Sequence, residues 1–281
     1  METTKIALFK GKQIRKTLHE NEWWFVINDI IEALTGSADP SQYFKRMKQR
    51  DPELAKLISQ GGGQFVPPLM LEVETSGGKQ KMYCWHTEGI FRIIQSIPSP
   101  KAEPFKRWLA KVGYERVQEI EDPELASKRT RMLYKLKGYS DDWIEKRMRG
   151  IAIREELTDE WQNRGAKGQK DYEILTAEIS KATFGITPDE YKGLKGLKRE
   201  NLRDHMDDFE LIFTMLGERS TTEIHRQENS DGVPKLKQDA RRGGRVAGNA
   251  RKELEKELGR PIVSKENYLP TSRKNKYLRE T

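Results

Sequence analysis

The chain has 281 residues, of which 35% are hydrophobic and 34% charged, a composition that suits about two globular domains with a densely charged surface. Its apolar runs are far shorter than the ~20 residues that cross a bilayer, and its first residues lack the apolar stretch of a signal peptide. A single cysteine, Cys84, excludes an internal disulfide and agrees with a reducing cytosol, so we expect a cytoplasmic protein.

The net charge of +8 is distributed unevenly along the chain. Residues 1–120 carry 18 Lys and Arg against 14 Asp and Glu, residues 121–230 carry 20 against 23, and residues 231–281 carry 14 against 7. The three segments therefore have net charges of +4, −3 and +7. This layout predicts two basic surfaces that could meet phosphate, with ordinary solvated faces as the alternative.

The beginning of the chain predicts short strands followed by helices. Residues 6–9, 14–18 and 23–26 are apolar or alternating segments typical of strands. Asn28 is a plausible N-cap for a helix over residues 29–34. A six-residue break at 35–40 then precedes a second helix over residues 41–50.

A hairpin and two further helices follow. Residues 69–74 and 80–85 predict a β-hairpin, and Thr87 can cap a helix over residues 88–97. A segment with three prolines comes next. After it, apolar residues recur at i, i+3, i+4 and i+7, a spacing that predicts an amphipathic helix. The residues on its inward face are Phe105, Trp108, Leu109 and Val112. We expect both helices to pack in the core.

From about residue 121 the strand pattern ends. Helices are predicted over 125–137, 141–163, 171–184, from Thr187, over 200–216 and over 235–258, with a linker at 228–234. The expected fold class is an α+β N-terminal domain, with a small sheet that includes the hairpin, followed by an all-α helical domain. We divide the chain into an α+β domain, a helical domain, and a basic helix with a tail that is extended or partly disordered, at residues 1–120, 121–228 and 229–281.

Residues for metal or covalent chemistry are weakly indicated. On a helix, His205 and Asp208 would share a face and could hold a metal, but a solvated face is the stronger interpretation. Cys84 lies close to His86, although its apolar strand favours packing. Neither a phosphate-binding glycine motif nor a nucleophile motif is present. We therefore expect no enzymatic activity, metal or cofactor, and a metal-dependent nuclease is the least favoured alternative.

The predicted helix over residues 41–50 carries a basic stripe. Tyr43, Phe44 and Met47 can dock it while basic and amide groups face outward. With the preceding helix it resembles a helix–turn–helix, although the break is longer than the usual three or four residues. Arginine and glutamine can read base edges, and lysine suits phosphate. We predict DNA contacts from five residues, with an ordinary exposed helix as the alternative: Lys45, Arg46, Lys48, Gln49 and Arg50.

A second basic stripe is predicted on the helix over residues 235–258. At 100° per residue its cations lie within an arc of roughly 100°. Glycines in a helix interior cost about 1 kcal/mol each relative to alanine, so Gly243, Gly244 and Gly248 need a reason. Close approach of another element is favoured over a break that brings backbone N–H groups to phosphate. Four further DNA contacts are predicted: Lys237, Arg241, Arg245 and Lys252.

Two stretches of the first half resemble the Bro amino-terminal domain shared by baculovirus repeated-ORF proteins and phage antirepressors. They are Tyr-Cys-Trp-His-Thr-Glu-Gly-Ile-Phe-Arg-Ile-Ile at 83–94 and Ser-Pro-Lys-Ala-Glu-Pro-Phe-Lys-Arg-Trp-Leu at 99–109. The resemblance covers about residues 5–120. Residues 195–206 and 243–251 are similar to the helical half of bacterial proteins related to DNA-damage-inducible protein D.

These resemblances imply DNA binding by the first domain and an antirepressor or DNA-damage-response role in regulation. We therefore expect a cytoplasmic DNA-binding regulator whose partners are DNA, a repressor or recombinase protein, and a second copy of the chain, without a membrane partner. The alternative is an antagonist that binds a repressor or a recombinase filament and does not contact DNA. DNA affinity that falls steeply with salt would distinguish the two.

Overall fold

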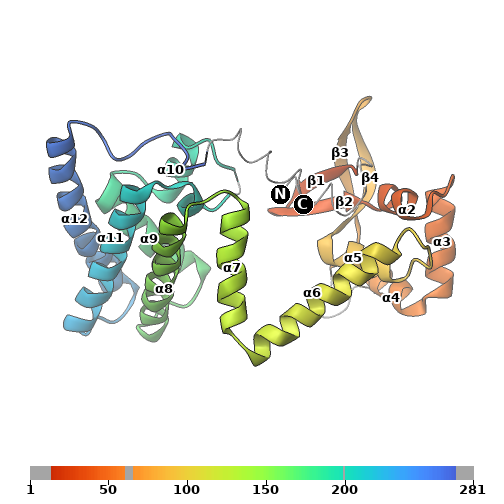
Figure 1. Ribbon diagram of the computed structural model, residues 1–281, viewed down its shortest axis with the longest axis horizontal. Helices are drawn as coiled ribbons and strands as arrows, with labels where there is room; N and C mark the ends of the chain where they lie inside the picture. Colours follow the sequence, from red (N-terminus) through yellow and green to blue (C-terminus); the bar gives the residue numbers. More distant parts are fainter. Residues whose placement is uncertain (1–13, 61–65, 199, 270–281) are drawn as a thin grey trace. The chain divides into compact units, whose positions relative to one another are not determined.

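The computed structural model describes residues 14–60, 66–198 and 200–269. The chain divides into two compact units, residues 1–126 and 127–281 (Figure 1). The first unit combines a four-stranded antiparallel sheet with helices, and the second is mostly helical, so the predicted fold class is confirmed. Among the described residues, none of the helices is both long and apolar enough to cross a membrane.

The sheet of the first unit is antiparallel throughout and has the strand order β1-β2-β4-β3. Its strands are β1 (Lys16–His19), β2 (Glu22–Val26), β3 (Leu69–Thr75) and β4 (Gly78–His86). The turn between β1 and β2 consists of Glu20 and Asn21, both with positive φ, as the tight turns of twisted hairpins require. The edge strands β1 and β3 approach each other, so the sheet is curled. The expected strand at residues 6–9 lies outside the described residues.

Five described helices complete this unit: α2 (Ile27–Thr35), α3 (Pro40–Arg50), α4 (Pro52–Gln60), α5 (Thr87–Gln95) and α6 (Glu103–Glu121). The expected caps were wrong at two of them. Helix α2 continues directly from β2, and Val26 stands at its N-cap without a side-chain hydrogen bond, so Asn28 is inside the helix. Helix α5 is capped by His86, whose Nδ1 accepts from the Gly89 N–H at 3.0 Å, and not by Thr87.

The core of the first unit lies between the sheet and helices α2 and α5. The isoleucines of both helices are buried against Trp85 and Cys84 of β4. A Cβ atom at Gly89 would lie 2.2 Å from the Trp85 ring, so glycine allows α5 to begin directly beside the indole. Cys84 is fully buried in this core, which confirms the packing role expected for it, and burial raises the pKa of its thiol to about 11.

From α7 onward the described chain is helical apart from its connections. Its elements are α7 (Glu124–Leu136), α8 (Asp141–Asn163), α9 (Gln169–Phe184), α10 (Pro188–Leu194), the 3-10 helix η1 (Leu202–His205), α11 (Asp208–Gln227) and α12 (Val233–Leu258). The expected start at Thr187 is confirmed, because its side chain and that of Glu190 form a capping box at the first turn of α10.

The single helix expected over residues 200–216 is instead two elements, η1 and α11. Asp207 interrupts it by forming a capping box with Glu210. The Asp207 carboxylate accepts from the Glu210 N–H at 2.8 Å, and the Glu210 carboxylate accepts from the Asp207 N–H at 2.7 Å. These bonds start α11 at Asp208, so the helix premise for a shared face of His205 and Asp208 was wrong.

Helix α12 is continuous through its glycines and packs on α9 and α11. A Cβ atom at Gly243 would lie 2.1 Å from the Thr221 hydroxyl oxygen, one at Gly244 would lie 2.6 Å from the Ile179 carbonyl oxygen, and one at Gly248 would lie 2.3 Å from the Ala182 carbonyl oxygen. The expectation that these glycines permit close approach of neighbouring helices is therefore confirmed.

After α12 the chain returns over the helical unit without regular secondary structure up to Leu269. Ile262 and Leu269 are buried in the core of the helical unit. The Tyr268 ring stacks on the Tyr139 ring, with 5.8 Å between the ring centres. The Lys195 ammonium donates to the Glu266 carbonyl at 2.6 Å. The rest of the tail, for which the sequence predicts an extended or partly disordered chain, lies outside the described residues.

Candidate nucleic-acid interface

Helix α3 is docked on the first unit by one apolar face. Phe44 and Met47 are buried, and Tyr43 is half-buried against the same core. The Asp39 carboxylate caps the helix by accepting from the Gln42 N–H at 2.9 Å, and Pro40 occupies its first position. This packing orients the rest of α3 outward, as its sequence pattern predicts.

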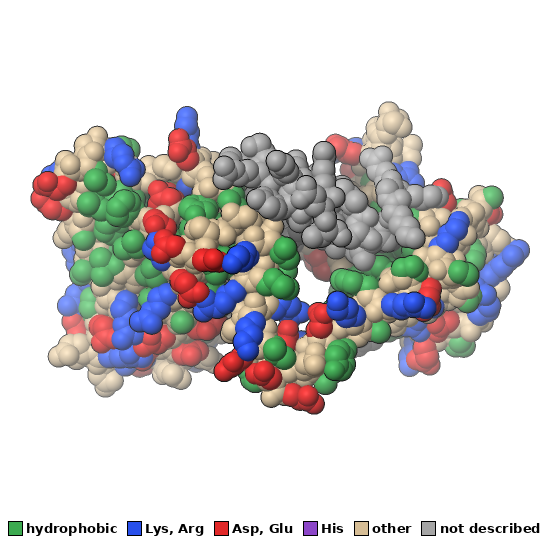
Figure 2. Space-filling model, viewed as in Figure 1, with side chains coloured by type: hydrophobic (Ala, Val, Ile, Leu, Met, Phe, Trp, Pro, Cys, Tyr) green, Lys and Arg blue, Asp and Glu red, His purple; other side chains and the backbone are tan. Residues whose placement is uncertain are grey.

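The outward face of α3 carries all five residues predicted to contact DNA. Lys45, Arg46, Gln49 and Arg50 are exposed, and Lys48 is half-buried, with its ammonium 5.1 Å from the centre of the Phe44 ring. Within residues 14–60, 66–198 and 200–269, no carboxylate forms an ion pair with any of the four cations. Figure 2 shows lysine and arginine side chains at the surface over α3. The face is therefore an uncompensated positive surface.

Helices α2 and α3 are separated by four residues, 36–39. The expected six-residue break was wrong because Thr35 still belongs to α2 and Pro40 already belongs to α3. Gly36 ends α2 in the left-handed conformation, with φ of 72°, which glycine adopts without strain. The Asn28 amide of α2 donates to the Ser41 hydroxyl of α3 at 2.9 Å. The break now agrees in length with a helix–turn–helix.

The far end of α3 is held by the carboxylate of Asp51, which lies between α3 and α4. It accepts from the Leu54 N–H at 2.9 Å, from the Ser96 hydroxyl at 2.6 Å and from the Arg92 guanidinium at 2.8 Å. Partial burial alone would raise the pKa of Asp51, but these hydrogen bonds and the charge of Arg92 outweigh it and lower the pKa. One side chain thus joins α3 and α4 to α5.

The second predicted stripe, on α12, is divided by Glu178 of α9. The Glu178 carboxylate binds the Lys237 ammonium at 3.1 Å and the Arg241 guanidinium at 2.6 Å, and hydrogen bonds from Arg241 and Lys237 lower its pKa although burial opposes this. Arg245 and Lys252 are exposed and have no ion-pair partner in the part of the chain that the structure describes. Of the four predicted contacts on α12, these two are therefore the ones without an ion pair among the described residues, whereas Lys237 and Arg241 share one carboxylate.

Residues 13–117 match the BRO family, N-terminal domain. The first unit contains a Bro-N domain. The match includes the whole sheet and α3, and it confirms the resemblance of the first half. Bro-N domains are associated with phage antirepressors and DNA-binding regulators. No curated protein matches the chain. The similarity of the second half to DNA-damage-inducible protein D stays an expectation.

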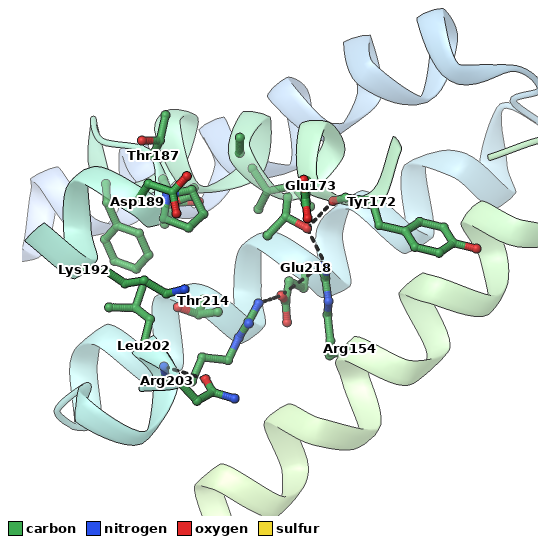
Figure 3. A pocket seen from close by; sticks show the side chains of 18 of the residues that line it. Arg154, Tyr172, Glu173, Thr187, Asp189, Lys192, Leu202, Arg203, Thr214 and Glu218 are labelled. Carbon is green, nitrogen blue, oxygen red and sulfur yellow. Dashed lines mark hydrogen bonds and ion pairs between the residues drawn. The ribbon is translucent and has the colours of Figure 1, made fainter. Parts of the chain in front are cut away.

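Outside the Bro-N domain, the helical unit contains a polar cavity of about 850 Å³ that the sequence did not indicate (Figure 3). Its charged centre is Glu218 of α11, whose Oε1 accepts from Arg154 of α8 at 3.5 Å and from Arg203 of η1. Burial lowers the pKa of Arg154 to about 10, although Glu218 opposes this effect. A second Arg154 nitrogen donates to the Thr176 hydroxyl at 2.5 Å. These bonds join α8, α9 and α11.

The residues considered for a metal do not converge. His205 is buried in η1, whereas Asp208 is the first residue of α11. The Asp208 carboxylate forms an ion pair with the Lys146 ammonium at 2.6 Å. Among the residues that the structure describes, no group of three or more His, Cys, Asp or Glu side chains could hold a metal ion. The uncompensated cations of α3 in the Bro-N domain, together with Arg245 and Lys252 in the helical unit, are therefore the strongest candidates for a functional surface.

Proposed function

We propose that this protein is a DNA-binding regulator whose Bro-N domain contacts duplex DNA through α3. One observation carries the proposal: α3 is fixed by buried Phe44 and Met47 while its cations face solvent without carboxylate partners among the described residues. Such cations can replace the counterions of DNA phosphates, and this replacement supplies most of the affinity of protein–DNA association. The helix–turn–helix spacing of α2 and α3 gives the same helix a geometry suited to a major groove.

The side chains of α3 divide into two roles. Arg46 and Gln49 have the planar donor and acceptor groups that recognise base edges, whereas Lys45 and Lys48 suit phosphate oxygens. Arg50 lies in the last turn, with its guanidinium 5.7 Å from the centre of the Tyr43 ring, and adds a further phosphate contact. In the helical unit, Arg245 and Lys252 contribute phosphate contacts, whereas Lys237 and Arg241 remain bound to Glu178.

Fluorescence anisotropy with labelled duplex DNA tests this proposal. If the four cations of α3 each neutralise one phosphate, affinity should fall roughly a hundredfold between ~50 and ~200 mM salt. The triple charge reversal Lys45→Glu, Arg46→Glu and Arg50→Glu should abolish binding while circular dichroism and the unfolding midpoint stay unchanged. DNA affinity that is absent at low salt, or insensitive to the triple reversal, would contradict the proposal.

A matched control separates a local site from a general effect of net charge. Reversal of Lys167, Lys170 and Lys181, which are exposed in the helical unit, changes the net charge by the same amount as the α3 variant. It should leave most of the DNA affinity intact. Equal losses in both variants would indicate attraction by total charge and not recognition by α3.

We further propose that the helical unit binds a protein partner, a repressor or a recombinase, in a pathway of the antirepressor or DNA-damage-response type. The proposal rests on the expected resemblance of residues 195–206 and 243–251 to proteins related to DNA-damage-inducible protein D. Affinity capture from damaged and undamaged cells, with and without nuclease treatment, tests it. A partner retained after nuclease treatment supports direct protein contact, and a partner lost with the DNA contradicts it.

A further inference from the structure

Helix α6 of the Bro-N domain has an apolar face that no described residue of its unit covers. Its inward face packs on α5, where the Phe91 and Phe105 rings are 5.7 Å apart. On another side of the helix, the exposed fractions of Tyr114, Val117 and Ile120 are 63%, 54% and 71%. Figure 2 shows hydrophobic side chains at the surface in the C-terminal half of α6. Neighbouring large apolar side chains at this exposure are typical of a binding surface.

The spacing along this face is that of a helix which packs against another helix. Lys106, Ala110, Gly113, Val117 and Ile120 follow one another at intervals of four, three, four and three residues, as the core positions of a coiled coil do. A Cβ atom at Gly113 would meet no atom within 4 Å. Packing among the described residues therefore does not explain this glycine, although glycine is unfavourable inside a helix.

The face is complementary to itself in an antiparallel arrangement. A twofold axis passing between Gly113 and Tyr114 sets each of these residues opposite the other in a second copy, and it sets Ala110 opposite Val117. The glycine leaves room for the tyrosine ring, and the alanine leaves room for the valine side chain. Large residues thus meet small ones across the axis, as close helix packing requires.

The charges at the two ends of the face agree with the same axis, which sets Lys106 opposite Glu121 of the second copy. Neither residue forms an ion pair within the described ranges. Other cations of α6 do form ion pairs along the helix: Arg107 with Glu103, Lys111 with Glu115 and Arg116 with Glu119. A parallel arrangement would place like charges together at both ends, so charge complementarity selects the antiparallel one.

We propose that α6 forms an antiparallel, twofold-symmetric contact with α6 of a second copy, so that the protein dimerises through its Bro-N domain. One helix face is smaller than a standard protein interface, and we therefore expect a reversible dimer with a dissociation constant on the order of micromolar. The contact is isologous, the arrangement by which most soluble homodimers form. This inference does not depend on DNA binding.

Sedimentation velocity of the full chain at a series of concentrations tests the proposal. Lys106→Glu and Glu121→Lys should each weaken dimerisation at least about tenfold, because each places like charges at both symmetric ends of the contact. The double variant should recover the wild-type dissociation constant, because it restores opposite charges at these positions. Val117→Lys should give a monomer, and Lys56→Glu on the exposed surface of α4 should have no effect.

Cross-linking provides a second measurement of the axis. Cys84 is buried, so a cysteine introduced by Gly113→Cys is the accessible thiol, and a short bis-maleimide should link two copies through it. A cysteine introduced by Lys56→Cys should not give this product. The proposal is overturned if the chain is monomeric at all concentrations, if the double charge exchange does not restore the dimer, or if no α6 variant changes an observed dimer.

Discussion

Asp51 shows how one side chain can set the position of a whole helix. It follows α3 directly, accepts the Leu54 N–H at the start of α4, and binds Arg92 and Ser96 of the α5 region. Hydrogen bonds to charged groups contribute more to stability than neutral ones, and an unpaired partner left behind adds a desolvation penalty. The orientation of the proposed DNA-contacting face therefore depends on this carboxylate.

We expect Asp51→Asn to lower the free energy of unfolding by about 2 kcal/mol at neutral pH, as measured by urea denaturation. The matched control is Asp39→Asn, since the Asp39 side chain makes only the capping contact with Gln42 within the described part of the chain, and asparagine caps nearly as well. Its effect should be less than about 0.5 kcal/mol. Equal effects of both substitutions would show that the contacts with Arg92 and Ser96 contribute little.

The effect of Asp51→Asn should also depend on pH in a defined direction. The pKa of Asp51 is lower in the folded chain than in the unfolded chain. Its contribution is therefore complete above the unfolded value of about 3.9 and is lost as the pH falls through the folded value. The difference in unfolding free energy between wild type and variant should shrink over that acidic range. A difference that stays constant there would contradict the ionic origin of the effect.

At the scale of elements, the position of α12 is determined by what its small residues touch. Gly244 and Gly248 face backbone carbonyl oxygens of α9, which cannot move aside as a flexible side chain can. Helix α9 also supplies Glu178, which binds Lys237 and Arg241 of α12. The same close approach thus packs the helix and neutralises part of its basic stripe.

We expect Gly248→Ala to lower the free energy of unfolding by about 2–3 kcal/mol, because its Cβ atom would lie 2.3 Å from the Ala182 carbonyl oxygen. Gly193→Ala is the matched control, since it lies in α10 and its Cβ atom would meet no atom within 4 Å. Alanine there should stabilise the protein by about 0.5–1 kcal/mol. Chemical denaturation of both variants measures the difference, and a neutral result for Gly248→Ala would mean that α9 and α12 can separate without cost.

Sequence patterns predicted a helix well where its apolar spacing is continuous along the chain. They predicted helix boundaries less well, because a single capping contact determines where a helix starts. The apolar spacing of Phe44 and Met47 identified the docked face of α3. The capping boxes at Thr187 and Asp207 share a glutamate three residues after the cap, yet only Thr187, which is followed by proline, was recognised as a start. Helix α4 was not predicted, although Asp51 and Pro52 are typical of a helix start, and in the structure Asp51 accepts from the Leu54 N–H.

For the whole molecule, the interface could be predicted only in part, because compensation of charge is a property of the fold. A helical wheel places Lys237, Arg241, Arg245 and Lys252 on one arc, but it does not contain Glu178, which is about sixty residues away in sequence and binds the first two. The same holds for Glu218 with Arg154 and Arg203, where three separate elements build one buried charge cluster. Long-range ion pairs of this kind leave no periodic signal.

This distinction between compensated and uncompensated cations leads to a prediction about DNA binding by the complete chain. Arg245→Ala with Lys252→Ala should weaken binding about equally for all DNA sequences and reduce the salt slope by about 1–2, because two phosphate contacts are lost. Lys237→Ala with Arg241→Ala removes the same charge from the same helix. Its effect on DNA affinity should be smaller, because Glu178 holds both side chains in ion pairs and compensates one of their two charges in the folded protein.

Anisotropy titrations with two unrelated duplexes over a range of salt concentrations measure both quantities for both variants. Gln49→Ala completes the comparison, since loss of an amide that reads a base edge should reduce the difference in affinity between duplexes and leave the salt slope unchanged. If the two pairs on α12 weaken binding equally, Glu178 must release Lys237 and Arg241 to the DNA. If neither pair has an effect, the phosphate contacts belong to the Bro-N domain alone.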